Sequence, residues 1–429
     1  MKMGILHGDM SAGGHGAARL PAPAGTRRRS APKGVLAYVS MLVSVLAGAF
    51  QVRAEVRVDA HLPAGNIVCE RAEGDRVYLH QERRGSTQWW FYWAFRVCGA
   101  EGRTLTFHFT DGEPVGTRGP AVSTDQGLAW RWLGKDFSKN SFSYTFSPAE
   151  TEVWFSFGMV YTQRDWDRFL KRFAGSPSAK PGQLAVTRKG RPVEMLRLGC
   201  VASEPRNRVL LTARHHSCEM MASYVLEGLI EGVLADGENG TWLRENVEFL
   251  IIPFVDKDGV EDGDQGKARG PRDHNRDYDG VSVHVETAAL REQVPKWAGD
   301  ALTMALDLHC PHIRGEYNEW VYQVGSSDTN LWLQQQAFGR VLERLRPNPL
   351  SYRQSNDLPS GKAWNTAANF SQGLSFARWA ARLPTVRFAG TFEIPYATAN
   401  GTEVNAQSAR DFGVNLAVAL RHYLAGKQR

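Results

Sequence analysis

The chain has 429 residues, of which 42% are hydrophobic and 22% are charged. This length and composition fit a globular protein with a large core and exclude a small disulfide-stapled protein. The formal net charge of +6 lies in residues 1–54, which hold seven of the 51 basic and one of the 45 acidic residues. The remaining 44 basic and 44 acidic residues balance, so nucleic acid is excluded as a partner.

Residues 1–54 have the layout of a secretory leader. The basic stretch RRRSAPK at 27–33 precedes an uncharged, mostly apolar run at 34–50, and VRA ends at Ala54 with small residues suited to cleavage. We therefore expect export to the periplasm or the medium, with cleavage after Ala54. The alternative is an uncleaved anchor, because 17 apolar residues barely span a bilayer. Without such an anchor we expect no stable membrane insertion.

Residues 55–162 form a first predicted domain. Short alternating runs such as RTLTFHFT (103–110), FSYTFS (142–147) and EVWFSFGMVY (152–161) are separated by glycine, proline and aspartate. This spacing predicts a small all-β sandwich with the aromatic residues in its core. Five cysteines leave at least one thiol unpaired, and Cys69 with Cys98 is the plausible bridge if the chain is oxidised.

Residues 163–429 form the second predicted domain, in which strand and helix patterns alternate. We expect strands within 208–213, 247–255, 301–310 and 384–395, helices over 219–234 and 406–424, and a loop at 176–183. Alternation of this kind predicts an α/β fold with a mixed, largely parallel sheet flanked by helices. Binding residues in such sheets lie at the carboxyl ends of the strands.

Polar motifs follow each of these strands. ARHHSCE places His216 and Glu219 one helical turn apart, where both side chains can reach the same point. DHNRDY begins at Asp273, DLHCPH contains His309, and TFEIPY contains Glu393. A His-x-x-Glu pair alone is weak evidence, but a carboxylate within an apolar strand is costly unless something uses it.

This ordered set of motifs resembles the zinc carboxypeptidases of the carboxypeptidase A and B superfamily. The resemblance covers about residues 163–429 and is closest to the cytosolic carboxypeptidase branch and its bacterial relatives. ARHHSCE matches the family's Arg-x-His-x-x-Glu, DHNRDY its Asn-Arg, DLHCPH its Asp-x-His, and TFEIPY its strand-borne glutamate. Residues 55–162 resemble the sandwich domain that this branch carries ahead of its catalytic domain.

The resemblance implies a zinc metallocarboxypeptidase that hydrolyses the C-terminal bond of a peptide or protein. His216, Glu219 and His309 would hold one Zn²⁺ per chain and leave a position for water. Glu393 would act as the general base. Asn275 and Arg276 would grip the terminal carboxylate of the substrate, which the fork of a guanidinium group suits.

The oxyanion-stabilising residue is less well defined. The resemblance implies an arginine upstream of the Asn-Arg pair, and Arg269 is the first choice, with Arg272 and Lys267 as rivals. Arg214 either binds substrate or packs structurally. Asp307 either orients His309 or simply ends the strand.

Two alternatives remain open for the pocket that receives the terminal side chain. Phe376 at that position would favour apolar C-terminal residues, and Arg378 would favour acidic ones. The family's flexible-loop tyrosine has no clear match, since Asn369–Trp379 offers only Phe370. His215, His274 and His312 are not expected to be ligands, and the acidic loop Asp256–Asp264 is expected to be solvated rather than a Ca²⁺ site.

Two other functions are weighed against this one. The first is a zinc amidohydrolase acting on a small N-acyl amino acid, which the extra β domain argues against. The second is a non-catalytic exported peptide-binding protein, which the full set of His216, Glu219, His309 and Glu393 argues against. No pro-segment is apparent, so no proteolytic activation is expected.

Overall fold

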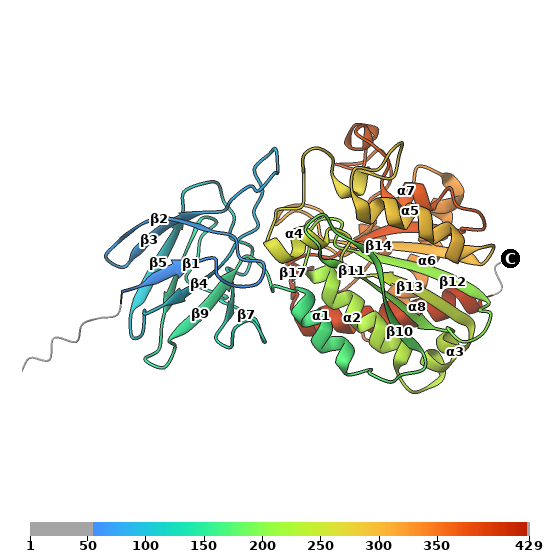
Figure 1. Ribbon diagram of the computed structural model, residues 1–429, viewed down its shortest axis with the longest axis horizontal. Coiled ribbons are helices and arrows are strands. Elements are labelled where there is room, and N and C mark those ends of the chain that lie inside the picture. The colour runs from blue at the N-terminus through green and yellow to red at the C-terminus, as the bar shows by residue number, and fades with distance from the viewer. Residues whose placement is uncertain (1–54, 427–429) are drawn as a thin grey trace, which may run out of the picture. The chain divides into compact units, whose positions relative to one another are not determined.

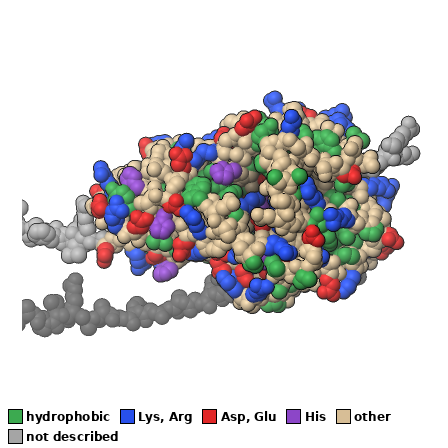
Figure 2. Space-filling model, turned by 90° about the horizontal axis from the view of Figure 1, so that it is seen from above, with side chains coloured by type: hydrophobic (Ala, Val, Ile, Leu, Met, Phe, Trp, Pro, Cys, Tyr) green, Lys and Arg blue, Asp and Glu red, His purple; other side chains and the backbone are tan. Residues whose placement is uncertain are grey.

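The computed structural model describes residues 55–426, which belong to one compact unit. The predicted leader at 1–54 lies outside the described residues. Within the described part of the chain, no helix is both long enough and apolar enough to cross a membrane. Lysine and arginine side chains are interspersed with aspartate and glutamate on the face shown in Figure 2, consistent with the balanced charge of this region.

The N-terminal β region consists of two sheets. One has the strand order β1 (Arg57–Asp59), β4 (Ala94–Cys98), β9 (Glu152–Ser156), β6 (Ala121–Ser123) and β7 (Arg131–Trp132). The other has the order β2 (Val68–Glu73), β3 (Arg76–His80), β5 (Thr104–Phe109) and β8 (Ser141–Thr145). Phe95 and Phe155 of the first sheet pack against Phe107 and Phe142 of the second, with ring centroids 5.3–6.3 Å apart. The alternating aromatic residues therefore form a core, as the pattern predicted.

All five cysteines are unpaired in the structure. The suggested bridge between Cys69 and Cys98 is therefore wrong. Cys69 lies on β2 and Cys98 on β4, which belong to different sheets, and Cys98 instead contacts Glu152 at 3.5 Å. Cys200, Cys218 and Cys310 are buried.

A seven-stranded mixed sheet organises the rest of the chain (Figure 1). Its order is β10 (Ala179–Val186), β11 (Pro192–Gly199), β13 (Val247–Ile252), β12 (Asn207–Ala213), β14 (Leu302–His309), β16 (Phe388–Glu393) and β15 (Tyr322–Gln323). The pairs β13–β12, β12–β14 and β14–β16 are parallel, and the outer pairs are antiparallel. This confirms the predicted mixed α/β fold. The first helix, α1 (Gln163–Lys171), begins after the β region ends, but the boundary predicted between residues 162 and 163 lies inside one compact unit and stays a prediction.

Helices cover both faces of this sheet because its strands are apolar on both sides. Along β12, Val209 and Leu211 face one core and Leu210 faces the other. The first core is covered by α2 (Met221–Leu234), α3 (Glu238–Asn246), α6 (Thr329–Arg344) and α8 (Ala406–Ala425). The second is covered by α5 (Val285–Ala298) and α7 (Phe376–Ala380). Glycine allows α2 and α8 to touch, since a Cβ at Gly228 would lie 1.9 Å from the backbone oxygen of Arg410.

The segment at 176–183 differs from the prediction. It was expected to be a loop because it contains proline and glycine, but residues from Ala179 onward belong to β10. β10 is the edge strand of the sheet, where Pro181 removes no hydrogen bond from the sheet interior. β11 and the helices α5 and α6 were also not anticipated from the sequence.

Contacts with the β region fix the loop that follows α4 (Lys257–Asp262). Gln265 accepts a hydrogen bond from the backbone N–H of Tyr92 at 2.7 Å, and the Ser86 hydroxyl donates to the backbone oxygen of Lys267 at 2.6 Å. The backbone N–H of Thr87 donates to Ala268 at 2.9 Å. The β region thereby sets the path of a loop that borders the site described next.

Candidate active site

His216 and Glu219 lie in the turn between β12 and α2. Arg214 leaves the strand with a positive φ of 62°, which turns the chain so that both following side chains point inward. The two side chains are buried, and His216 Nδ1 lies 2.7 Å from Glu219 Oε1. A turn before α2, closed by a hydrogen bond from the Glu219 N–H to the His216 backbone oxygen at 3.2 Å, brings both donor atoms to one point.

His309 completes this cluster from the last residue of β14. Its Nδ1 lies 2.7 Å from Glu219 Oε2 and 3.2 Å from His216 Nδ1. Ligands around a tetrahedral zinc at about 2.1 Å lie roughly 3.4 Å apart, so this nitrogen and oxygen set fits Zn²⁺. Burial raises the pKa of Glu219, but the charges of His216 and His309 more than offset it and hold the carboxylate ionised.

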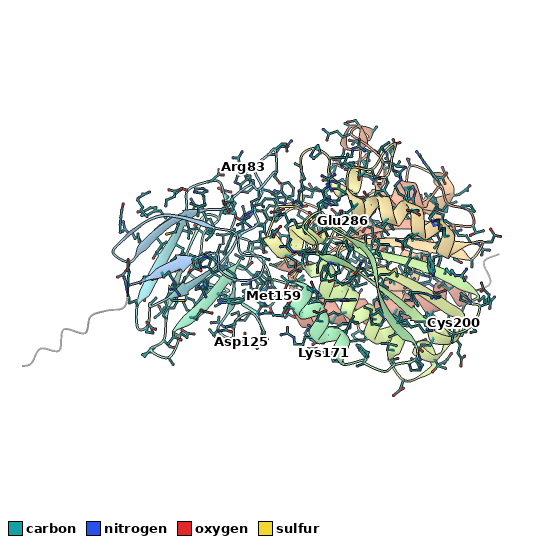
Figure 3. The ribbon with its side chains drawn as sticks, viewed as in Figure 1. Arg83, Asp125, Met159, Lys171, Cys200 and Glu286 are labelled. Carbon is teal, nitrogen blue, oxygen red and sulfur yellow. The ribbon has the colours of Figure 1, made fainter. Side chains whose placement is uncertain are left out.

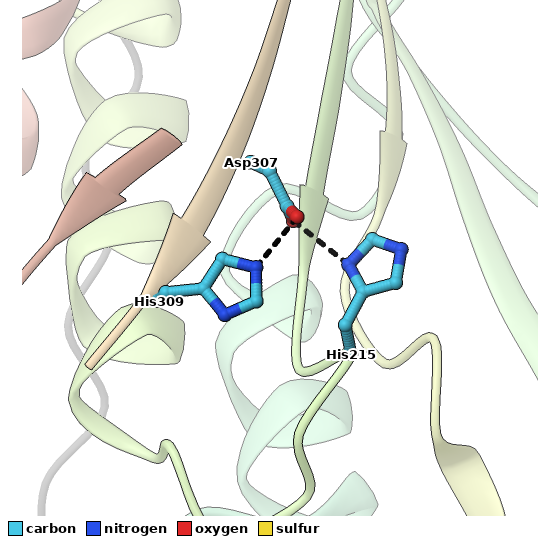
Figure 4. Close-up of side chains that lie close together, drawn as sticks. All are labelled: His215, Asp307 and His309. Carbon is cyan, nitrogen blue, oxygen red and sulfur yellow. Dashed lines mark hydrogen bonds and ion pairs between the residues drawn. The ribbon is translucent and has the colours of Figure 1, made fainter. Parts of the chain in front are cut away.

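Asp307 orients two histidines from the interior of the sheet (Figure 4). Its carboxylate accepts hydrogen bonds from His309 Nε2 at 2.6 Å and from His215 Nδ1 at 2.9 Å. A ligating histidine that donates its other N–H to a carboxylate has its tautomer and ring orientation fixed. The other ring nitrogen of His215, Nε2, lies 2.7 Å from the Tyr278 hydroxyl. Both ring nitrogens of His215 therefore have a partner within the protein.

Asp273 was not identified from the sequence as a site residue. Its carboxylate lies 3.2 Å from His216 Nε2. Asp273 therefore orients the imidazole ring of His216, as Asp307 orients that of His309. Burial raises the pKa of Asp273, but the neighbouring charges of His216 and Lys267 outweigh it and keep the group ionised. Its position two residues before Asn275 was the signal that could have revealed it.

We predict that Asp273→Asn weakens zinc binding roughly 10-fold to 100-fold, because loss of an orienting carboxylate lowers the basicity of the ligating imidazole. The measurement is a zinc titration in competition with a chelator of known affinity. Asp279→Asn is the matched control, since Asp279 is exposed in the same segment. Equal zinc affinity in the Asp273 variant and the wild type would contradict this role.

Glu393 ends β16 and is the sheet partner of His309. The carboxylate is buried, and its Oε2 has no hydrogen-bond partner among the described residues. Burial raises the pKa of Glu393 to about 7, while His309 acts in the opposite direction. A buried carboxylate with an unsatisfied oxygen beside a metal-ligand cluster is placed to exchange a proton with a bound water.

A cavity of about 640 Å³ opens beside this cluster. Asn275 and Arg276 line it from the short 3₁₀ helix η1 (His274–Arg276). The Arg276 guanidinium donates to the backbone oxygens of Asn275 and Asn369. It forms none of the ion pairs found among the described residues, so its positive charge stays available to an anionic ligand in the cavity.

The three candidates for oxyanion stabilisation lie in different places. Lys267 lines the cavity, with its Nζ 3.3 Å from both ring nitrogens of His216. Arg269, the first choice from the sequence, instead forms ion pairs with Asp256 and Asp264 and does not line the cavity. Arg272 is likewise engaged, donating to Asp277 at 3.0 Å. The structure therefore brings only Lys267 of these three to the metal-ligand cluster.

Close packing explains how Lys267 reaches His216. Gly266 has a φ of 72°, and a Cβ there would lie 2.1 Å from the backbone nitrogen of Ser217. Only glycine lets the loop approach the ligand turn this closely. Asp256, Asp258, Asp262 and Asp264 lie on or beside α4, and all four form ion pairs with Arg191 or Arg269, so the acidic stretch is more ordered than the solvated loop that was expected.

Arg214 does not reach the cavity. Its guanidinium is buried and donates to the backbone oxygens of Ser217 and Tyr161 and to the hydroxyl of Ser223. These contacts hold the ligand turn against α2 and the preceding chain. Of the two alternatives from the sequence, the packing role fits this position and substrate binding does not.

Phe376 and Arg378 are likewise separated. Phe376 is fully buried against Tyr278 and Trp379 and does not line the cavity. Arg378 lines the cavity and lies over the ring of Phe370, 3.8 Å from its centroid. On α7 these two residues point to different sides, so only Arg378 can meet a ligand directly.

Comparisons with known proteins agree with this geometry. Residues 168–296 match the family model described as zinc carboxypeptidase, a segment that includes His216, Glu219, Asn275 and Arg276. Cytosolic carboxypeptidase 3 of Mus musculus is 25% identical over 241 residues, which is 51% of this chain and 23% of that protein. An uncharacterized protein of Zymomonas mobilis is 25% identical over 213 residues, 48% of this chain and 54% of that one. The chain thus spans about half or less of these relatives.

Solved structures share the fold over most of the chain. A metallo-carboxypeptidase from Burkholderia cenocepacia has a TM-score of 0.71 at 20% identity, covering 86% of this chain and 99% of that one. A metallo-carboxypeptidase from Pseudomonas aeruginosa has a TM-score of 0.68 at 20% identity with the same coverage. The family uses one zinc, which fits the donor set of His216, Glu219 and His309. Sequence match, fold and donor set agree: residues 168–296 match the zinc carboxypeptidase family model, and the chain shares its fold with solved metallo-carboxypeptidases.

Proposed function

We propose that this chain is a metallocarboxypeptidase that removes the C-terminal residue of peptides or proteins. The observation that carries the proposal is one cavity lined by a metal-ligand set, Glu393 and Arg276. Among the described residues, Glu393 Oε2 has no hydrogen-bond partner and the Arg276 guanidinium forms no ion pair. Zinc held by the ligand set would polarise the scissile carbonyl and lower the pKa of a water molecule. An endopeptidase does not bind the terminal carboxylate of its substrate, so its mechanism does not require a buried cation at this position.

The residues of the cavity divide the reaction between them. Arg276 and Asn275 hold the terminal carboxylate and so position the last peptide bond beside the ligand set. Glu393 accepts the proton of the attacking water and passes it to the leaving amine. Lys267 supplies a positive charge where negative charge develops on the carbonyl oxygen.

We further propose a preference for acidic C-terminal residues. Arg378 and Arg382 both line the cavity, and neither forms an ion pair among the described residues. Burial and the nearby Arg382 lower the pKa of Arg378, so an anion placed between them would be stabilised.

The test compares release of Glu and of Leu from otherwise identical peptides by the zinc-loaded chain. We expect Arg378→Gln to lower kcat/KM for the Glu-terminated peptide roughly 10-fold to 100-fold, because a charged hydrogen bond contributes about 1.5–3 kcal/mol. Release of Leu should change little. Arg344→Gln is the control, since Arg344 is exposed on α6 and does not line the cavity.

Two results would overturn these proposals separately. A wild type that prefers Leu over Glu would remove the acidic preference and leave the carboxypeptidase activity. Hydrolysis of small N-acyl amino acids without release from any peptide would instead favour the amidohydrolase alternative.

Export of the chain is also a proposal, based on the basic stretch and the apolar run within residues 27–50.

A further inference from the structure

A second cluster of metal-ligating side chains lies outside the catalytic site. It consists of His274 in η1, His284 at the N-cap of α5, and Glu286 in the first turn of α5. Glu286 is labelled in Figure 3. One ligand atom from each of the three residues lies within 4.8 Å of the others. None of these residues lines the catalytic cavity.

His274 carries an unsatisfied buried nitrogen. Its side chain is buried, and its Nδ1 has no hydrogen-bond partner among the described residues. Asp256 Oδ2 is 3.8 Å away, too far for a hydrogen bond. A buried polar atom without a partner costs about 1–3 kcal/mol, so a group that uses this nitrogen is expected.

His284 has the hydrogen bond that a ligating histidine typically makes. Its Nε2 lies 2.8 Å from the backbone oxygen of Arg272. Because a carbonyl only accepts, Nε2 carries the proton and Nδ1 keeps its lone pair. The same arrangement, a second ring nitrogen donating to a carbonyl or carboxylate, fixes metal-binding imidazoles in general.

Glu286 supplies an oxygen ligand with little competition from the protein. The side chain is buried, and its only hydrogen bond from the described residues comes from its own backbone amide. Burial raises the pKa of Glu286 to about 7, and Asp256 and Asp258 add to this while Arg188 opposes it. A bound cation would reverse the balance and stabilise the ionised carboxylate.

We propose that His274, His284 and Glu286 form a second metal site, which binds a divalent cation of the zinc class. Two imidazole nitrogens and one carboxylate oxygen are donors that Zn²⁺ prefers, with water as a fourth ligand. The two rings are stacked, with centroids 3.6 Å apart and planes at 19°, so they must tilt to reach one ion. The partial exposure of His284 allows this movement and gives the ion a route from solvent.

The position of this site links two segments of the fold. An ion held there ties η1 to the start of α5, and η1 also carries Asn275 and Arg276. The metal would therefore fix the segment that grips the substrate carboxylate without touching the substrate. This consequence rests on the proposed function, whereas the metal site itself does not.

The test counts metal ions bound to the whole chain. After removal of metal with a chelator, the protein is titrated with Zn²⁺, and bound metal is measured by mass spectrometry. We expect two equivalents per chain in the wild type and one in His284→Ala and in Glu286→Gln. His216→Ala should also keep one equivalent, because it empties only the catalytic site.

Further measurements separate this inference from folding defects and from the catalytic proposal. His422→Ala, at an exposed histidine on α8, should keep both equivalents. Glu286→Gln preserves shape, so thermal unfolding of its metal-free form should match the wild type. Co²⁺ added to the His216→Ala chain should give visible absorption bands that His284→Ala removes in the double variant. One equivalent in the wild type and none in His216→Ala would overturn the second site and leave the first intact.

Discussion

Glu393→Gln is expected to lower kcat for peptide hydrolysis by roughly 10²-fold to 10⁴-fold, the contribution typical of a general base. The amide keeps the shape of the side chain but cannot accept a proton from water. The measurement is release of the C-terminal residue from a peptide that the wild type hydrolyses. KM should change little, because Glu393 does not belong to the groups that hold the terminal carboxylate.

The control for this variant is its zinc content. Glu393 is not one of the three clustered ligands, so about one catalytic zinc should stay bound. The midpoint temperature of thermal unfolding should not fall. An amide in place of the buried carboxylate also removes a group whose pKa burial raises to about 7, which favours the folded state at neutral pH and above. A variant that retains more than a tenth of wild-type kcat would show that another group accepts the proton.

Arg276→Gln is expected to lower kcat/KM on the order of a hundredfold or more for every peptide with an unmodified C-terminus. In the proposed function the Arg276 guanidinium binds the substrate carboxylate, and each charged hydrogen bond contributes about 1.5–3 kcal/mol. Because this contact is made in the bound state and in the transition state, most of the loss should appear in KM. Steady-state kinetics on peptides ending in Glu and in Leu measures it.

The comparison with Arg378→Gln makes the Arg276 prediction specific. Arg276→Gln should slow both peptides equally, whereas Arg378→Gln should slow only the one that ends in Glu. Arg276→Lys should not restore the activity fully, because an ammonium group lacks the planar fork that pairs with a carboxylate. Equal rates on amidated and unmodified peptides in the wild type would remove the role of Arg276 altogether.

The ligand set was open to prediction because its spacing is local. His216 and Glu219 are three positions apart, so a single turn of the chain between β12 and α2 brings their side chains together. His309 and Glu393 required only that their strands be parallel and adjacent, which the alternation of strands and helices already indicated. The mixed fold class followed from the same alternation.

The choice of Arg269 over Lys267 and the open alternative of Phe376 or Arg378 concern positions that depend on packing rather than on spacing. Arg269 and Lys267 are two positions apart, and only contacts with Asp256, Asp264 and the β region decide which one reaches the cavity. Phe376 and Arg378 differ in the same way, since the short helix α7 buries Phe376 in the core and places Arg378 at the cavity.

The sequence by itself predicted the fold class from periodicity. It also predicted that His216, Glu219, His309, Glu393 and the Asn275–Arg276 pair lie at one site, from motifs at the strand ends and the resemblance that they carry. The tertiary structure alone decided that Asp273 orients His216, that Lys267 and Arg378 rather than Arg269 and Phe376 line the cavity, and that His274, His284 and Glu286 meet. The physical reason is that charges and hydrogen bonds act over a few ångströms in space, and a linear sequence does not encode that distance directly.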